Sequence, residues 1–315
     1  MKLGMFISDT SPSDDGIEVI VERAQWAESA GLASGWVPYV PWSFDAMVAL
    51  TVVGRETSRL QLGTAVIPTY PFHPQAMARG ALSVNAVTGG RLSLGIGPSH
   101  PSVIEGMYGL SYERAGVHTR EYVEALRSAF ELSGNVEAHG DFYDFRSMFA
   151  VPGKPTAPGL LIAALAPNML RLAGDRADGT ILWLADEHAL STYVLPRISA
   201  AANGAGRPAP RIVVGMPIAI CDDADEAREN AARIFAAYTQ IPTYSRILER
   251  SSDTRPEAIA LIGSEATVAA RLRNFANVGA TELLAAPFAW GASKHATLAR
   301  TREFLASMVS EAGSW

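Results

Sequence analysis

Short hydrophobic runs alternate with amphipathic segments along the whole chain. Most of these runs are continuously apolar, which is typical of strands that are buried on both faces of a parallel sheet. The pattern predicts eight strands, at residues 3–8, 34–40, 60–68, 91–97, 159–165, 179–185, 211–221 and 281–288.

The segments between the strands carry apolar residues at helical spacing. In residues 16–30, Ile20 and Ala24 fall on one face of such a helix. Asp15 followed by Glu18 predicts a side-chain cap at its start. Further helices are predicted at residues 44–56, 74–87, 117–132, 167–175, 187–202, 224–238, 265–278 and 293–311.

Strand–helix alternation of this kind predicts right-handed βαβ units. For 315 residues, a closed (β/α)8 TIM barrel with loop insertions fits best, and a doubly wound open sheet is the alternative. Insertions are expected at residues 98–116, 134–158 and 222–280, with a short hairpin arm at 141–146. No linker, repeat or low-complexity segment divides the sequence, so we expect one barrel domain over residues 1–315.

Composition narrows the classes of function. The chain is 48% hydrophobic and 18% charged, and its formal net charge of −6 argues against a nucleic-acid partner. Because no run of about 18 apolar residues and no signal-peptide pattern occurs, we expect no membrane span. Cys221 is the only cysteine, which excludes a disulfide framework and favours the cytoplasm.

The ligands of a barrel of this type bind at the C-terminal ends of its strands. One such end is TGGRLSLGIGPSH, residues 88–100. Its Gly95 and Gly97 do not form a dinucleotide fingerprint, because His100 takes the third glycine position and two prolines oppose a helix that starts directly. Two interpretations of the glycines remain: they relieve crowding in the strand, or they let the backbone approach a flat ligand.

Two other strand ends have unusual sequences. In residues 60–74, small residues followed by three prolines predict a bulge or an unusual peptide, or else a crowded rim. After the fifth strand, Pro167 suits the first position of a helix. The amides of Leu165, Ala166 and Asn168 would then form an anion site at the helix terminus. A single phosphate fits this turn better than a nucleoside triphosphate, and an ordinary βα turn is the alternative.

Few side chains at the strand ends suit proton transfer. His100 and Glu105 follow the fourth strand and are the best candidates for a general acid or base, and the alternative for each is a solvated loop residue. The six histidines show no metal-binding spacing, and no GxSxG motif occurs. The sequence therefore supports neither a metal site nor a serine hydrolase.

Three segments together resemble the bacterial-luciferase-like monooxygenase superfamily, in particular its branch that uses the deazaflavin coenzyme F420. They are LGTAVIPTYPFHPQAMA (62–78), TGGRLSLGIGPSH (88–100) and LLIAALAPNMLRLAGDRADGTIL (160–182). The resemblance implies a (β/α)8 barrel with a flavin-like ring across its mouth. It also implies a non-prolyl cis peptide behind the ring, which would be Ala65–Val66.

The resemblance also implies residues of the site. His100 falls where relatives that oxidise sugar phosphates have a glutamate, and we expect it to donate a proton, with Tyr39 and Glu105 as further catalytic candidates. The cofactor phosphate is expected at the turn after the fifth strand. The expected cofactor contacts are Trp42, Ala65, Val66, Ile67, Gly97, Pro98, Ser99, Ala164, Leu165, Ala166, Pro167, Asn168 and Trp183.

One departure from the family bears on the reaction. Many F420-dependent relatives have an Asp-His pair after the second strand, whereas this chain has VPYVPW at residues 37–42. Without that base, alcohol oxidation is disfavoured. We expect instead a reductase that transfers hydride from reduced F420 to an activated C=C or C=N bond of a small organic substrate.

Several alternatives remain open beside this prediction. They are an FMN-dependent monooxygenase and a non-catalytic F420-binding protein, whereas the missing GxGxxG motif disfavours a nicotinamide dehydrogenase. A homodimer is implied by the resemblance alone. A set of aromatic residues is expected either to line the mouth or to pack in the core: Phe6, Trp36, Trp42, Tyr70, Trp183 and Trp290.

Overall fold

Eight parallel strands form the centre of the molecule. The structure is a computed structural model that describes residues 1–9, 15–153, 155–291 and 294–315. The eight strands are β1 (Lys2–Phe6), β2 (Ser34–Val37), β3 (Gln61–Thr64), β5 (Leu92–Gly97), β8 (Gly159–Ala163), β9 (Gly179–Trp183), β10 (Arg211–Ile220) and β12 (Glu282–Pro287).

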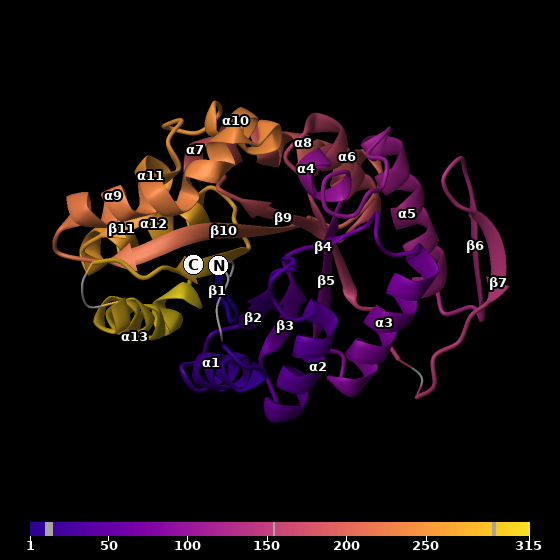
Figure 1. Ribbon diagram of the computed structural model, residues 1–315, viewed down its shortest axis with the longest axis horizontal. Coiled ribbons are helices and arrows are strands. Elements are labelled where there is room, and N and C mark those ends of the chain that lie inside the picture. The colour runs from indigo at the N-terminus through magenta and orange to yellow at the C-terminus, as the bar shows by residue number, and fades with distance from the viewer. Residues whose placement is uncertain (10–14, 154, 292–293) are drawn as a thin grey trace.

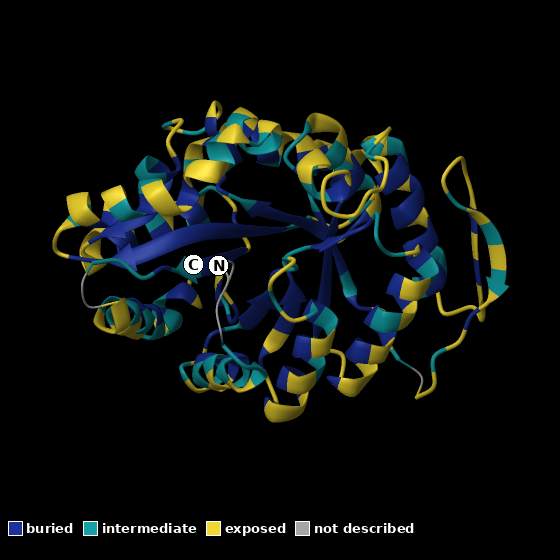
Figure 2. Cartoon of the chain, in the orientation of Figure 1, coloured by how far each residue is buried: buried dark blue, intermediate teal, exposed yellow. Residues whose placement is uncertain are grey.

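These strands close into a barrel. Each of the eight pairs in parallel with the next along the chain, and β12 pairs with β1 to close the ring. The strands are buried on both sides, as Figure 2 shows, which explains why their sequences are continuously apolar. The predicted (β/α)8 barrel is confirmed. The doubly wound sheet is wrong, because an open sheet has two unpaired edges.

Helices surround the barrel, as Figure 1 shows, and each predicted helix has a counterpart. The helices of the described residues are α1 (Ile17–Ser29), α2 (Ala46–Glu56), α3 (Pro74–Val87), α4 (Pro101–Ile104), α5 (Ala115–Phe130), α6 (Pro167–Arg176), α7 (Glu187–Ala189), the π-helix η1 (Leu190–Val194), α8 (Leu195–Gly204), α9 (Ala224–Phe235), the 3₁₀-helix η2 (Ala236–Gln240), α10 (Pro242–Leu248), α11 (Pro256–Ile259), α12 (Glu265–Asn277) and α13 (Lys294–Ala312). Within these ranges, none is both long and apolar enough to cross a membrane.

Two details of the helices differ from the prediction. The first residue before α1 is Gly16, which provides no side-chain cap, and the carboxylate of Asp15 instead accepts a hydrogen bond from Arg23 at 2.8 Å. The predicted Asp15 cap is therefore wrong. The helix predicted at residues 187–202 is interrupted by the π-helix η1, a local widening that apolar periodicity does not reveal.

The third predicted strand, residues 60–68, is divided into two pieces. β3 ends at Thr64, and β4 (Ile67–Pro68) pairs with β5. Between them, the Ala65–Val66 peptide bond is cis, which confirms the bond implied by the family resemblance. The Thr64 side chain bonds the chain to β5 at this interruption. Its Oγ1 accepts a hydrogen bond from Gly95 N–H and donates one to Gly95 O, both at 2.8 Å.

Two strand glycines stand at crowded positions inside the barrel. A Cβ on Gly95 would lie 2.1 Å from the carbonyl oxygen of Thr64, and a Cβ on Gly63 would lie 2.1 Å from the Trp36 ring. Neither position has room for a side chain. Gly63 and Gly95 therefore relieve crowding between strands and inside the barrel, and the approach of a ligand to Gly97 stays a prediction.

A buried polar network fills the N-terminal end of the barrel interior. Trp36 Nε1–H donates to the carboxylate of Glu282 at 2.9 Å, and the Ser34 hydroxyl also hydrogen-bonds that carboxylate. Arg211 reaches Glu282 at 3.3 Å and Ser93 at 2.9 Å. Trp36 is consequently a core residue rather than part of the mouth.

Arg91 links backbone segments by hydrogen bonds at the same N-terminal end of the barrel, on its outer side. Its guanidinium donates five hydrogen bonds of 2.6–3.0 Å, to the carbonyl oxygens of Gly54, Thr57, Leu60 and Thr88 and to the Thr57 hydroxyl. A single side chain thus satisfies carbonyl groups at the ends of α2 and α3 and before β3.

The expected insertions contain structure of their own. In residues 98–116, the short helix α4 begins at Pro101 with His100 before it, so the prolines permit a helix there, since proline is tolerated at a first helical position. In 134–158, the hairpin consists of β6 (Asn135–His139) and β7 (Asp144–Met148), so the predicted arm at 141–146 covers only the turn and half of β7. In 222–280, α9–α12 accompany β11 (Leu261–Gly263), which pairs with β10.

A buried histidine joins the β6–β7 hairpin to the barrel. The His118 ring stacks on Tyr70 with a centroid separation of 3.7 Å, and its Nε2 lies 2.9 Å from the Tyr143 hydroxyl. Burial lowers the pKa of His118 to about 4, so the ring is neutral at pH 7. Tyr70, expected either at the mouth or in the core, is half-buried and packs against this cluster.

Candidate functional site

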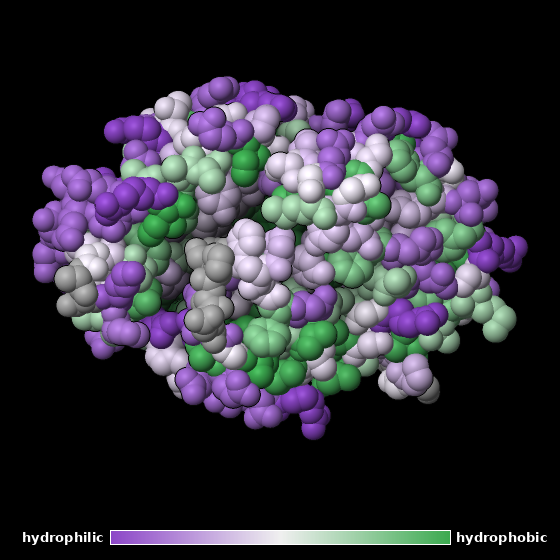
Figure 3. Space-filling view, in the orientation of Figure 1, coloured by the Kyte–Doolittle hydropathy of each residue, from purple (hydrophilic) through white to green (hydrophobic). Residues whose placement is uncertain are grey.

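The C-terminal end of the barrel has an apolar floor. Phe6 at the end of β1, together with Ala65 and Val66, is partly buried and packs on a buried layer inside the barrel. That layer consists of Trp36, Leu161, Ile181, Val213 and Leu284. The floor is thus apolar and supported from beneath. Figure 3 shows apolar side chains bordering a hollow near the centre of the viewed face.

A continuous row of aromatic rings runs from the floor to the end of β5. Trp183 lies 5.9 Å from Phe6, Tyr238 lies 6.0 Å from Trp183, and Tyr244 lies 4.9 Å from Tyr238. His100 completes the row at 5.4 Å from Tyr244. These separations are those of packed aromatic pairs. The row therefore brings together the ends of β1, β9 and β5 and the segment η2–α10.

Trp183 is held in place by the backbone around it. A Cβ on Gly215 in β10 would lie 2.8 Å from the Trp183 ring, so the glycine leaves the space that the indole occupies. The following residue, Leu184, has a φ of 58°, which ends β9 and turns the chain toward α7. The predicted cofactor contact Trp183 is thus part of the floor edge and faces the aromatic row.

His100 is half-buried beside Tyr244. Desolvation lowers the pKa of His100 below its ordinary value, so its imidazole is neutral at pH 7. The backbone before it is fixed, because Ser99 has a φ of 63° and its carbonyl accepts a hydrogen bond from the Tyr112 hydroxyl at 2.8 Å. No carboxylate lies within ion-pair distance of His100 in the described part of the chain.

The other two catalytic candidates lie in different surroundings. Burial, followed by the nearby Asp45 and Tyr108, raises the pKa of Tyr39 to about 12, so its phenol keeps its proton at neutral pH. Its ring also contacts Phe72 at 5.7 Å. Glu105 is exposed, and its carboxylate accepts a hydrogen bond from Tyr112 N–H at 3.3 Å. Neither side chain belongs to the aromatic row, and their catalytic roles stay predictions.

The turn between β8 and α6, the predicted phosphate site, has no side-chain cap. Ala166 precedes the helix and provides no side-chain cap, and Pro167 is the first helical residue. In contrast, Asp45 caps α2 by accepting from two backbone N–H groups. The first amides of α6 are therefore not occupied by a side-chain cap, and phosphate binding at this turn stays a prediction. The turn is tied to η1 because the Tyr193 hydroxyl donates to Leu165 O at 3.1 Å.

The remaining predicted residues are distributed around this end. Ile67 and Gly97 are buried in β4 and β5, Pro98 is half-buried beyond them, and Ala164 is buried in the turn after β8. Asn168 is exposed on α6, and Trp42 is exposed in the loop after β2.

The sequence did not predict two rings of the row, Tyr238 and Tyr244, as site residues. They lie in the middle of the 222–280 insertion, and no local pattern indicates which part of an insertion folds back over the mouth. The described residues contain no cluster of three or more metal-binding side chains.

Comparison with known proteins shows similarity over nearly the whole chain. The family model of the luciferase-like monooxygenases matches residues 1–282. The 5,10-methylenetetrahydromethanopterin reductase of Methanolobus tindarius is 26% identical over 302 residues, which cover 87% of this chain and 91% of the relative. The F420-dependent glucose-6-phosphate dehydrogenase of Mycolicibacterium fortuitum is 28% identical over 262 residues, which cover 77% and 76% of the two chains.

Solved structures show the same fold. The oxygenating constituent of 3,6-diketocamphane monooxygenase from Pseudomonas putida, solved in complex with FMN, superimposes with a TM-score of 0.75 at 17% identity and covers 99% of this chain and 98% of that one. These findings confirm the resemblance that the sequence motifs indicated and the expectation that the chain is an enzyme. The chain belongs to the luciferase-like monooxygenase family.

Proposed function

We propose that this protein is an F420-dependent oxidoreductase and that it works as a reductase. The substrate class is a small organic molecule with an activated C=C or C=N bond. Two curated relatives, a reductase and an F420-dependent dehydrogenase by name, support the cofactor and the general reaction. When bound, reduced F420 supplies the hydride.

The residues at the barrel mouth fit such a cofactor. Ala65 and Val66 offer an apolar support for a tricyclic ring, and Ser99 flanks it just beyond the end of β5. The turn before α6 offers uncapped amides for a phosphate. The aromatic row stands over this floor and would exclude water and orient a planar substrate.

The absence of the family's Asp-His pair at residues 37–42 supports the direction of the reaction. Desolvation lowers the pKa of His100, which makes its imidazolium a stronger acid and its imidazole a weaker base. Alcohol oxidation needs a base that removes a hydroxyl proton, whereas reduction of a C=C or C=N bond needs a proton donor. His100 can supply this proton from its imidazolium form, and Tyr39, whose phenol keeps its proton at neutral pH, is a second donor.

Cofactor binding and turnover test the proposal. The purified protein is titrated separately with F420 and with FMN, and binding is followed by quenching of cofactor fluorescence. We expect F420 to bind more tightly. Reduced F420 is then incubated under anaerobic conditions with a panel of enones and imines, and we expect its oxidation to depend on at least one of them. Tight F420 binding without turnover across the panel would instead indicate a non-catalytic F420-binding protein.

An FMN-dependent monooxygenase is the second candidate function, because a fold neighbour was solved with FMN. This candidate predicts tighter binding of FMN than of F420. It also predicts oxygen consumption when reduced FMN and substrate are supplied together. The same titration therefore separates the two candidates.

We further propose that the protein is a cytoplasmic homodimer that associates through α2. Phe44, Val48 and Val52 are exposed and lie four residues apart, so they form one apolar stripe along this helix and the loop before it. Figure 3 shows apolar side chains gathered over the α2 region. Exposed apolar patches of this kind commonly mark subunit interfaces. The single, buried and unpaired thiol of Cys221 suits a reducing compartment.

A further inference from the structure

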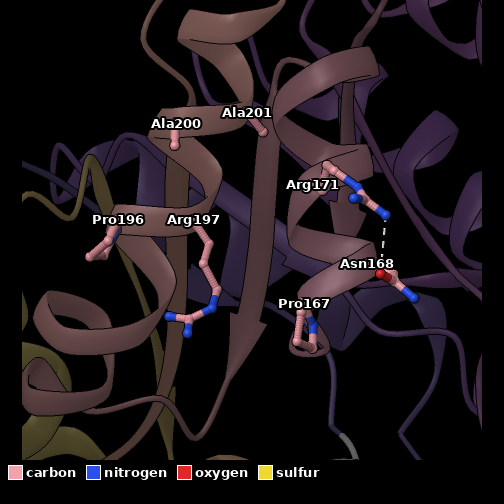
Figure 4. Close-up of a pocket in the computed structure, with 7 residues that line it drawn as sticks. All are labelled: Pro167, Asn168, Arg171, Pro196, Arg197, Ala200 and Ala201. Atoms are coloured by element: carbon pink, nitrogen blue, oxygen red, sulfur yellow. Dashed lines mark hydrogen bonds between the residues drawn. The ribbon is translucent and has the colours of Figure 1, made fainter.

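A groove of about 510 Å³ lies on the outer surface between α6 and α8. It begins at Pro167 and Asn168, the first residues of α6, and continues past Arg171 to the facing helix, where Pro196 and Arg197 line it. Figure 4 shows that the two arginines come from opposite walls. The groove therefore starts at the turn between β8 and α6, the proposed phosphate site, which we call the anion turn, and it leads away from the barrel mouth.

The arginines around this groove lack acidic partners. Arg171 donates to the Asn168 side chain at 3.2 Å and Arg197 donates to the Tyr193 carbonyl at 2.8 Å. No carboxylate lies within 4.0 Å of the guanidinium of Arg171, Arg197 or Arg250 in the described ranges, although ion pairs occupy many other arginines. These three arginines therefore leave local positive charge on the surface of a chain whose formal net charge is −6.

Tyr193 connects this positive cluster to the anion turn. The guanidinium carbons of Arg197 and Arg250 lie 4.1 and 4.2 Å from the centroid of the Tyr193 ring. The hydroxyl of the same tyrosine donates to Leu165 O in the turn. Tyr193 is also part of the π-helix η1, a local irregularity that often accompanies functional sites. One residue thus fixes two cations relative to the proposed phosphate position.

We infer that the groove between α6 and α8 binds a chain of carboxylates attached beyond the cofactor phosphate. This inference rests on the proposed function, because F420 continues past its phosphodiester into a tail of γ-linked glutamates, whereas FMN ends at its phosphate. A phosphate at the start of α6 would direct such a tail into the groove. There Arg171 and Arg197 can pair with carboxylates, and Arg250 adds positive charge on the Tyr193 side.

Binding of two forms of the deazaflavin tests the groove separately from the mouth. Dissociation constants are measured for F420 with its glutamate tail and for the same molecule lacking all glutamates, at low and at high salt. We expect the glutamylated form to bind the wild-type protein about tenfold more tightly at low salt, which equals about 1.4 kcal/mol. The ratio should fall as salt screens these exposed charges.

Substitutions assign the preference to the arginines. In the double variant Arg171→Gln/Arg197→Gln, the preference for the glutamylated form should fall to less than about twofold, with the tail-free constant unchanged. Arg197→Lys keeps the charge and should retain most of the preference. Arg59→Gln removes an exposed arginine at the opposite end of the barrel and should leave the preference intact.

The outcomes distinguish the two proposals. Equal affinity of the wild-type protein for both forms would refute binding of the tail in the groove, and so would a preference that survives in the double variant. Neither result would contradict the F420 assignment. If neither deazaflavin binds and FMN does, the proposed function and the groove both fail.

Discussion

Replacement of His100 by alanine should slow turnover in a manner that depends on pH. A positioned general acid contributes about 10²–10⁴-fold to a rate. At an ordinary pKa of about 6.5, roughly a quarter of histidine side chains are protonated at pH 7. Burial lowers the pKa of His100, so the active imidazolium is scarcer than that, and only part of the acid effect is expressed at pH 7.

The sign of the pH dependence follows from this shift. As the pH falls from 7 toward the lowered pKa, the imidazolium population and kcat of the wild-type enzyme should rise by up to about tenfold per pH unit. His100→Ala should lose this rise. The ratio of wild-type to variant kcat should therefore be about 10–100 at pH 7 and clearly larger at pH 5.5.

The assay follows oxidation of reduced F420 by absorbance, under anaerobic conditions, with a substrate identified from the enone and imine panel. The matched control is His139→Ala, because the His139 side chain is 70% exposed on the β6–β7 hairpin, outside the aromatic row. It should preserve both kcat and its pH profile. If His100→Ala retains the wild-type kcat and the same pH profile, His100 is not the proton donor and the reasoning from burial is refuted.

Three further predictions concern stability and assembly. Arg91→Met leaves several carbonyl groups without their donor, so the free energy of unfolding measured with urea should fall by about 3–5 kcal/mol; an unchanged midpoint would contradict this. Burial alone would raise the pKa of Glu28, but hydrogen bonds from Arg59, Leu60 and Ser58 lower it to about 2. The contribution of ionised Glu28 to the free energy of unfolding is therefore present above pH 4.5 and is lost as the pH falls toward 2. After allowance for solvent screening, Glu28→Gln should lower the free energy of unfolding by about 1–2 kcal/mol at pH 7 and by almost nothing at pH 2. Val48→Glu should convert the proposed dimer to a monomer, as measured by light scattering, whereas Met148→Glu on the exposed hairpin should leave it a dimer. A Val48→Glu variant that stays dimeric would refute association through α2.

The sequence predicted the regular parts of the barrel because burial on both faces leaves a strong signal. The continuous apolar runs located the strands, and the spacing of residues such as Ile20 and Ala24 located a helix. The cis bond at Ala65–Val66 left no trace in hydrophobic pattern and was reached only through the family resemblance. Asp15 was misjudged because a carboxylate near a helix start has more than one partner within reach, and here Arg23 lies within 2.8 Å.

Long-range packing explains what the sequence did not predict about the site. Trp36 was expected either at the mouth or in the core, and its hydrogen bond to Glu282, which is distant in sequence, places it in the core. Tyr238 and Tyr244 were not expected at the site. Their contacts with Trp183 and His100, which are distant from them in sequence, place them in the aromatic row. Such contacts depend on how an insertion folds back, which local propensities do not encode.

The origin of the aromatic row also has an evolutionary consequence. Its outer rings, Tyr238 and Tyr244, belong to a segment inserted between β10 and β12, while the floor and the anion turn belong to the barrel strands and their own short connections. Mutations in the insertion can reshape the substrate side without disturbing the residues that would hold the redox group. A lineage with this arrangement can acquire new substrates by exchanging one surface segment, and a laboratory library confined to η2 and α10 would explore the same freedom.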